Sequence, residues 1–381
     1  MTEVHGTLTS PAPPRARLLV VSASMGAGHD TVATELVRRA TESGHRASTV
    51  DILSLLPRGL GGWLRRGYRV SVRHAPWTYG LVYRAFLRPG RGPRPSGVPL
   101  ARLAADRLRE LVERDRVDVV VPVFHLAAQL TGHLRANRLL PVPSVVYMIE
   151  FGAHRHWLHP GNDRFLCLTE RAAQEVRLAT GRPADVTGPV VAPRFTAPAS
   201  GAERWRRFFE DFHPGRTPVL MSAGAWGVAS RPVTTARRLA RDGYLPVVLC
   251  GRNERLRASL TGFAGVLPLG WQDDMPGLMG AARALVDNAG GLTAVQALAA
   301  GLPVIGYRPL PGHFAQGARR MAELGVSDLA TDDLGLLDSL RRLTRPGTER
   351  DLRIARGKEL FHDERAPLER VLAAVAADTG R

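Results

Sequence analysis

The sequence predicts an α/β protein with two doubly wound parallel sheets that face each other across a cleft. The chain has 381 residues, enough for two domains that each bury a core. Apolar strand-like runs alternate with helix-like runs, as in parallel βαβ units. Two glycine-rich turns, SASMGAGH at residues 22–29 and NAGG at residues 288–291, each follow a strand-like run and open a helix-like run. Such turns present backbone amides and a helix N-terminus to an anion.

The first domain is expected to span residues 17–188, after a polar, proline-containing segment at 1–16 that we expect to be disordered and that lacks the apolar core of a signal peptide. A helix should begin at Asp30 as N-cap and run to residue 43, where Gly44 stops it. The other expected helices are at residues 100–114, 126–137 and 170–180. The expected strands are at residues 17–24, 46–53, 117–124, 144–150, 164–168 and a short run ending at 188.

Residues 189–200 contain three prolines and few charges, and we interpret them as a linker. The pattern restarts in residues 201–349, with strands expected at 218–223, 245–251, 265–271, 284–288 and 303–308. Residues 350–381 should form helices that pack back on the first domain. The sequence has no run of 18 or more apolar residues, so we expect no membrane-spanning helix. Cys167 and Cys250 lie in apolar runs and are interpreted as buried reduced thiols, which favours a cytoplasmic location.

Positive charge is concentrated in one segment of a chain whose net charge is +17. Residues 52–105 contain ten arginines and no Asp or Glu, together with several Trp and Tyr residues. This mixture suits contact with anionic lipid headgroups. A nucleic-acid partner is less favoured, and a solvated basic loop is the alternative. The membrane-facing candidates are Trp63, Arg65, Arg66, Arg69, Arg73 and Trp77.

The first glycine-rich turn allows close approach of a ligand through Gly26 and Gly28. A dinucleotide-binding turn would have a third glycine where Thr31 stands, although Asp51 does end the second strand, so an NAD-linked enzyme is an alternative. His29 stands at the mouth of the turn, where the near-neutral pKa of histidine suits a general base. The other interpretation of His29 is a histidine that hydrogen-bonds the turn.

The second turn has features of a diphosphate site. Gly290 and Gly291 can close on the diphosphate, Thr293 can donate a hydroxyl hydrogen bond, and Gln296 can reach a ribose. Loops after other strands should line the same cleft, because ligands of doubly wound sheets bind at the carboxyl ends of strands. Their candidate residues are Gly224, Trp226, Arg252, Pro311, Gly312 and His313, with Arg252 offsetting phosphate charge.

A third segment joins a carboxylate to histidines. Glu150 is followed by His154, His156 and His159. No helical pair of histidines at i and i+4 is present and no cysteine is near, so no metal is expected. A glutamate at a strand end beside His154 suits acid–base work or positioning of an acceptor hydroxyl.

Several motifs together resemble the monogalactosyl- and glucosyl-diacylglycerol synthases, which are GT-B glycosyltransferases related to the peptidoglycan enzyme that adds N-acetylglucosamine to lipid I. The similarity covers roughly residues 17–330. The matching motifs are SMGAGH (24–29), IEFGAH (149–154), W-x-H-P (157–160), VLCGRN (248–253), GWQDDM (270–275), AGGLT (289–293) and GLP (301–303).

The resemblance implies a GT-B fold of two Rossmann-like domains and an inverting transfer of galactose or glucose from a UDP-sugar to a lipid hydroxyl, with diacylglycerol the first choice. The first domain would receive the lipid at the inner membrane face, and the second would bind the UDP-sugar without a cofactor. His29, Glu150 and His154 would be the catalytic candidates. The resemblance adds Trp271 and Met275 to the donor-site candidates.

Three departures from the family pattern leave alternatives open. The family's Thr-Asp is Ile149-Glu150 here, its acidic ribose contact is Gln296, and its final donor loop has His313, Phe314 and Gly317. A GT-B enzyme with a non-lipid acceptor and a catalytically degenerate homologue that binds sugar nucleotides or lipids therefore stand beside the main prediction.

Overall fold

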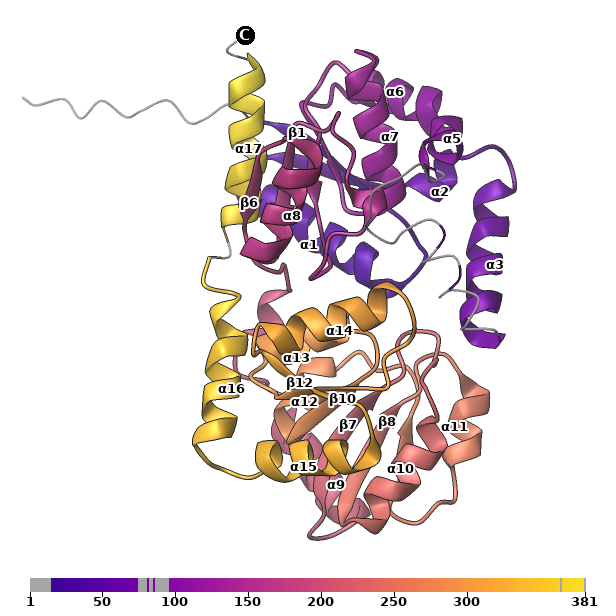
Figure 1. The fold of residues 1–381 in the computed structure, drawn as a ribbon, viewed down its shortest axis with the longest axis vertical. Coiled ribbons are helices and arrows are strands. Elements are labelled where there is room, and N and C mark those ends of the chain that lie inside the picture. The colour runs from indigo at the N-terminus through magenta and orange to yellow at the C-terminus, as the bar shows by residue number, and fades with distance from the viewer. Residues whose placement is uncertain (1–14, 75–80, 82–84, 86–95, 364, 380–381) are drawn as a thin grey trace, which may run out of the picture.

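The computed structural model describes residues 15–74, 81, 85, 96–363 and 365–379. Two α/β lobes are stacked along the long axis of the molecule, the first drawn in indigo to magenta and the second in pink to orange (Figure 1). Each lobe is built on parallel strands, so the predicted fold class is confirmed. Strand residues alternate between core clusters on the two faces of a sheet: Leu18 and Val20 point to one cluster and Leu19 and Val21 to another. Both faces are therefore covered by helices.

The first lobe has strands in the order β2-β1-β3 and β4-β5-β6, and a parallel bridge from Val120 to Ser144 joins the two sets. The strands are β1 (Arg17–Ser22), β2 (Arg46–Asp51), β3 (Val119–Pro122), β4 (Val145–Tyr147), β5 (Arg164–Cys167) and β6 (Ala184–Val186). The helices are α1 (Ala27–Glu42), α2 (Ile52–Leu55), α3 (Leu60–His74), α5 (Val98–Ala101), α6 (Ala105–Arg114), α7 (His125–Ala136) and α8 (Glu170–Thr180), with 3₁₀ turns η2 (Arg102–Ala104) and η3 (Arg155–Trp157).

The start of α1 corrects one prediction. The N-cap is Gly26, not Asp30, and no side chain caps the helix. Asp30 lies in the first turn, where its carboxylate accepts a hydrogen bond from Ser22 Oγ at 2.7 Å. The helix therefore begins four residues earlier than the pattern suggested, and its first amides are left without a capping side chain.

The second lobe has one six-stranded parallel sheet in the order β12-β11-β10-β7-β8-β9. Its strands are β7 (Thr217–Ser222), β8 (Tyr244–Leu249), β9 (Leu267–Leu269), β10 (Ala284–Asp287), β11 (Val304–Tyr307) and β12 (Ser327–Ala330). Its helices are α9 (Ala202–Phe212), α10 (Pro232–Arg241), α11 (Glu254–Leu260), α12 (Met275–Ala281), α13 (Leu292–Ala299), α14 (His313–Glu323), α15 (Asp333–Thr344) and α16 (Thr348–Glu359). The edge strand β12 was not predicted, because its SDLA sequence is short and half polar.

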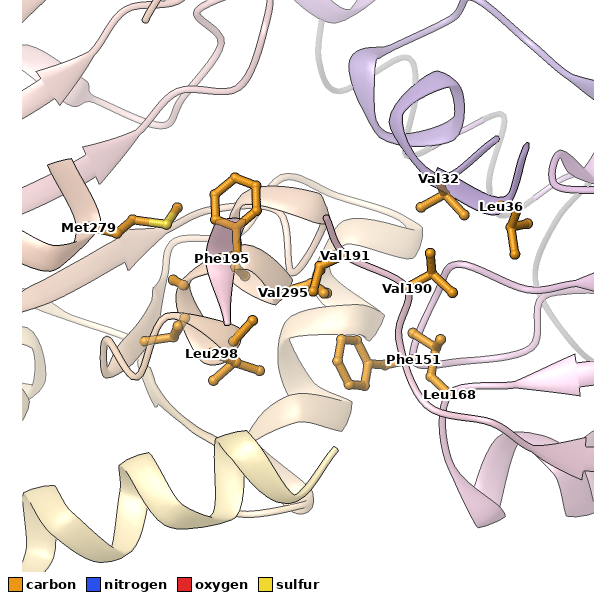
Figure 2. Packing of buried hydrophobic residues seen from close by; sticks show 14 of the residues in the cluster. Val32, Leu36, Phe151, Leu168, Val190, Val191, Phe195, Met279, Val295 and Leu298 are labelled. Atoms are coloured by element: carbon orange, nitrogen blue, oxygen red, sulfur yellow. The ribbon is translucent and has the colours of Figure 1, made fainter. Parts of the chain in front are cut away.

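The segment between the lobes is packed rather than loose. It contains a 3₁₀ turn, η4 (Pro193–Phe195), and its residues Val190, Val191 and Phe195 are buried. Figure 2 shows Val190 near Val32 of α1, Val191 near Val295 of α13 and Phe195 on the side of Met279, in a cluster shared by both lobes. Helix α17 (Ala366–Thr379) returns to the first lobe and contacts β3, β4 and β5 (Figure 1).

Two further features concern membranes and cysteines. Among the described residues, no helix combines the length and the apolar character that crossing a bilayer requires. Cys167 and Cys250 are both buried free thiols, as predicted, and burial raises the pKa of each, that of Cys250 to about 11.

Candidate active site

The two glycine-rich turns meet between the lobes. The first follows β1 and contains Gly26, Gly28 and His29, and the second follows β10 and contains Gly291. They approach so closely that a Cβ atom added to Gly28 would lie 3.7 Å from Cβ of Leu292. The first turn therefore lies within van der Waals reach of helix α13, and a Cβ at position 28 would make only ordinary contacts.

His29 is held in one tautomer. Its Nδ1 atom lies 2.7 Å from the carbonyl oxygen of Val123, and its ring packs edge-on against Phe124 with centroids 4.9 Å apart. Since a carbonyl oxygen only accepts, Nδ1 carries the proton and Nε2 keeps its lone pair. Burial lowers the pKa of His29, against the opposing effects of the Val123 carbonyl and Glu150. The ring is therefore neutral near pH 7, the form that a general base requires.

Glu150 follows β4 and lies beside His154. The Glu150 Oε1 and His154 Nε2 atoms are 3.5 Å apart, and the His154 side chain is buried. Burial acts to raise the pKa of Glu150, but His154 and His313 outweigh it and hold that pKa below its usual range. The structure thus places an ionised carboxylate in the first lobe, within the same cluster as His29.

His125, the first residue of α7, was not among the predicted site residues. Its ring centroid lies 5.1 Å from that of His154 and 5.8 Å from that of His156. Burial, then His154 and His156, lower the pKa of His125 well below 6.5. The available signal was its position after β3, at the carboxyl end of a parallel strand.

No group of three or more His, Cys, Asp or Glu side chains in the described part of the chain is arranged to hold a metal ion. His159, which the sequence placed near the glutamate, uses its Nδ1 to accept a hydrogen bond from the amide of Gly161 at 3.1 Å. The His159 side chain therefore stabilises its own turn through this hydrogen bond.

His313 brings the second lobe to this cluster. It is the first residue of α14, after Gly312, which has a φ of +92° as the N-cap. Its ring centroid lies 6.3 Å from that of His154. Burial lowers the pKa of His313 to about 4, with Glu150 opposing and His154 adding to the shift. Its neighbour Pro311 is exposed.

The turn after β10 is stabilised by hydrogen bonds to a buried carboxylate. The buried carboxylate of Asp287 accepts hydrogen bonds from the amides of Ala289 at 2.9 Å and Gly290 at 2.6 Å. Gly290 has a φ of +59°, and a Cβ there would lie 2.7 Å from the amide nitrogen of Ala318. A Cβ on Gly291 would meet open space. The amides suited to an anion are thus those of Gly291 and the first turn of α13, which includes Thr293.

The remaining donor-site candidates lie either beside the two glycine-rich turns or on the exposed surface. Gly224 is exposed, and Trp226 on the same loop donates from Nε1 to the carbonyl oxygen of Met25 at 3.3 Å, so this loop lies against the first glycine-rich turn. Gln296 is buried in α13. Arg252 and Trp271 instead form an exposed pair, with the guanidinium 4.7 Å from the ring centroid.

Met275 lies in neither of these places. As the first residue of α12 it is half-buried and packs against the core cluster that spans the lobes.

Residues Leu60–His74 of the basic segment form helix α3, which the sequence did not predict. Trp63 is 78% exposed and Arg66 is also exposed. Arg65 instead pairs with Asp51 at 2.7 Å, and Arg69 stacks over Trp226 of the second lobe at 4.2 Å. Arg73 is the penultimate residue of α3, and Trp77 lies outside the described residues.

Asp51 does not fit the dinucleotide alternative. Its Oδ1 accepts a hydrogen bond from the amide of Leu53 at 2.9 Å, and its Oδ2 accepts from Arg65 at 2.7 Å. A ribose would have to displace one of these partners. This engagement weighs against an NAD-linked enzyme.

Comparison with known proteins finds similarity to a family model and to curated relatives. Residues 29–191 match the family model described as monogalactosyldiacylglycerol (MGDG) synthase. The processive diacylglycerol beta-glucosyltransferase of Bacillus subtilis strain 168 is 24% identical over 336 residues, covering 86% of each chain.

Solved structures show the same fold. The MurG protein of Acinetobacter baumannii matches with a TM-score of 0.58 at 16% identity, over 97% of this chain and 100% of that one. The Medicago truncatula protein UGT71G1, complexed with UDP-glucose, matches with a TM-score of 0.61 at 12% identity, over 96% and 98%.

Proposed function

We propose that this chain, which is similar to the monogalactosyldiacylglycerol synthase family model and to processive diacylglycerol glucosyltransferases, is a GT-B glycosyltransferase that transfers glucose or galactose from a UDP-sugar to diacylglycerol. The observation that carries the proposal is the approach of the turn before His29 and the strand end before Glu150 to the start of α13, since a Cβ on Gly28 would lie 3.9 Å from Cδ1 of Ile149 and 3.7 Å from Cβ of Leu292. An acceptor hydroxyl and a sugar diphosphate can therefore be held on opposite sides of one cleft.

The transfer would be a single displacement with inversion. Nε2 of His29 accepts the proton of the acceptor hydroxyl while that oxygen forms a bond to the anomeric carbon. The bond from this carbon to the diphosphate oxygen breaks, and UDP leaves with the electron pair. Glu150 stabilises the imidazolium that forms on His29, and the Gly291 and α13 amides stabilise the diphosphate. Glu150 and His154 are the alternative bases, should His29 only orient the hydroxyl.

The acceptor would reach this site from a membrane surface. Trp63, 78% exposed, and the exposed Arg66 lie on helix α3, and the chain carries a net charge of +17. An exposed Trp beside Arg favours the headgroup region of anionic lipids. We propose that α3 binds the inner face of the cell membrane peripherally.

The decisive experiment is mass spectrometry of lipids after incubation with purified protein. Vesicles of anionic phospholipid containing diacylglycerol would be offered with UDP-glucose or UDP-galactose, and the His29→Ala variant would serve as control. A hexosyl-diacylglycerol product that depends on His29 supports the proposal and names the sugar. Absence of product with every donor, while UDP binds in calorimetry, would overturn it in favour of another acceptor or of a degenerate homologue.

A further inference from the structure

We infer that Glu175 is a positioning residue that ties the acceptor-side loop carrying Glu150 and His154 to the donor-side helix α14. This inference rests on the proposed function, because it concerns the alignment of the two halves of that site. Glu175 lies on α8 of the first lobe, away from the reacting groups themselves.

The two carboxylate oxygens of Glu175 have different partners. Oε1 accepts a hydrogen bond from Arg320 of α14 at 2.7 Å, and Oε2 accepts one from the amide of Ala153 at 3.3 Å. Ala153 directly precedes His154 in the loop. One carboxylate therefore fixes both the loop of the first lobe and the helix of the second.

The contact with α14 continues along one face of the helix. His313, Gln316 and Arg320 are spaced i, i+3 and i+7, so they share a face. The His313 ring lies 6.3 Å from that of His154, and a Cβ on Gly152 would lie 3.0 Å from Nε2 of Gln316. The loop is thus packed against α14 from its catalytic end to the Arg320–Glu175 pair.

The Arg320–Glu175 pair is shielded enough to hold this arrangement. The Arg320 side chain is 15% exposed and that of Glu175 is 30% exposed. Arg171 lies 3.7 Å from Glu175 and also pairs with Glu323 of α14 at 2.8 Å, which makes a network across the lobes. Removing Glu175 would free the loop and release α14 together, and His313 would lose its register with Glu150.

The test uses full-length Glu175→Ala, Glu175→Gln and Arg320→Ala variants. The matched control is Glu170→Gln, also on α8, whose partner Arg177 lies in the same helix. Hydrogen exchange across residues 149–157 reports loop order without any activity. In Glu175→Ala, exchange of this segment should rise at least tenfold, and kcat should fall about 10- to 100-fold because the reacting groups are misplaced. The Kd for UDP should stay within twofold.

The Gln variant separates the two contacts. Its amide oxygen can still accept from Ala153, so exchange protection should return, while kcat stays low because the charge for Arg320 is gone. Adding Arg320→Ala to Glu175→Gln should then lower kcat no further. Exchange in Glu175→Ala that equals that of the Glu170→Gln control, or independent effects of positions 175 and 320, would overturn the inference. Failure of glycosyl transfer in the wild type would instead overturn the proposed function, and the exchange result would still decide the role of Glu175 in loop order.

Discussion

Substituting Gly290 by alanine should destabilise the second lobe. Gly290 has a φ of +59°, a conformation that costs a non-glycine residue about 1–2 kcal/mol. Its new Cβ would also stand 2.7 Å from the backbone nitrogen of Ala318, and backbone cannot rotate away as a side chain can. Relief of such overpacking costs about 1–3 kcal/mol, so the sum is about 2–5 kcal/mol.

The adjacent Gly291 is the matched control. It has no left-handed conformation, and a Cβ there would meet open space, so Gly291→Ala should change the free energy of unfolding by no more than about 0.5 kcal/mol. If its amide faces the diphosphate, a larger side chain must intrude on the ligand. Gly291→Val should therefore weaken UDP binding about tenfold or more.

Thermal unfolding and isothermal titration with UDP measure the two effects. For a lobe of this size, the Gly290→Ala change should lower Tm by roughly 5–15 °C. Gly291→Val should keep the wild-type Tm and lose UDP affinity. An unchanged Tm in Gly290→Ala would refute the packing of this turn on α14, and an unchanged Kd in Gly291→Val would refute the placement of the donor site.

Four other predictions follow from the same structure. His29→Ala should lower kcat at least about 100-fold with an unchanged UDP Kd, and the acid limb of the wild-type rate profile should lie below pH 6.5, because burial lowers the His29 pKa. Asp287→Ala removes the charged acceptor of two hydrogen bonds from the half-buried amides of Ala289 and Gly290 and should cost about 2–5 kcal/mol, measured by urea unfolding. Replacing Trp63 and Arg66 with Ser should reduce co-sedimentation with anionic vesicles, more visibly at low salt. The pKa of His125 is lowered in the folded state, so the unfolded chain binds more protons below pH 6.5. The Tm should therefore fall as the pH drops from 7 to 5. This fall should be less steep in the His125→Gln variant.

Most strands were predictable because they are apolar runs bounded by turn residues, whereas the half-polar edge strand β12 was not. Helix α8 matches the expected residues 170–180, where Thr169 caps the start and Gly181 ends the helix with a φ of +67°. Helix α3 was not predicted because glycines and arginines interrupt its short apolar stripe. Leu60 and Leu64 of this stripe pack on the core. A stripe of that length resembles a loop until its packing partner is known.

The site was predictable only in part. Glycines after strands and a histidine at a turn have local signatures, and the structure brings His29, Glu150 and His154 into one region. His125 joins them only through the order of the strands, which is a property of the whole sheet. Likewise, the pairing of Arg69 with Trp226 depends on how the lobes sit together, so a basic residue assigned to the membrane proved to contact the second lobe.

The return of α17 to the first lobe affects the order of assembly during synthesis. The strands β3, β4 and β5 are covered by residues 366–379, which the ribosome produces after the entire second lobe. The second lobe can thus complete its sheet while the first still exposes an apolar face. A fragment ending near residue 350 would lack α17 and leave that face open to aggregation.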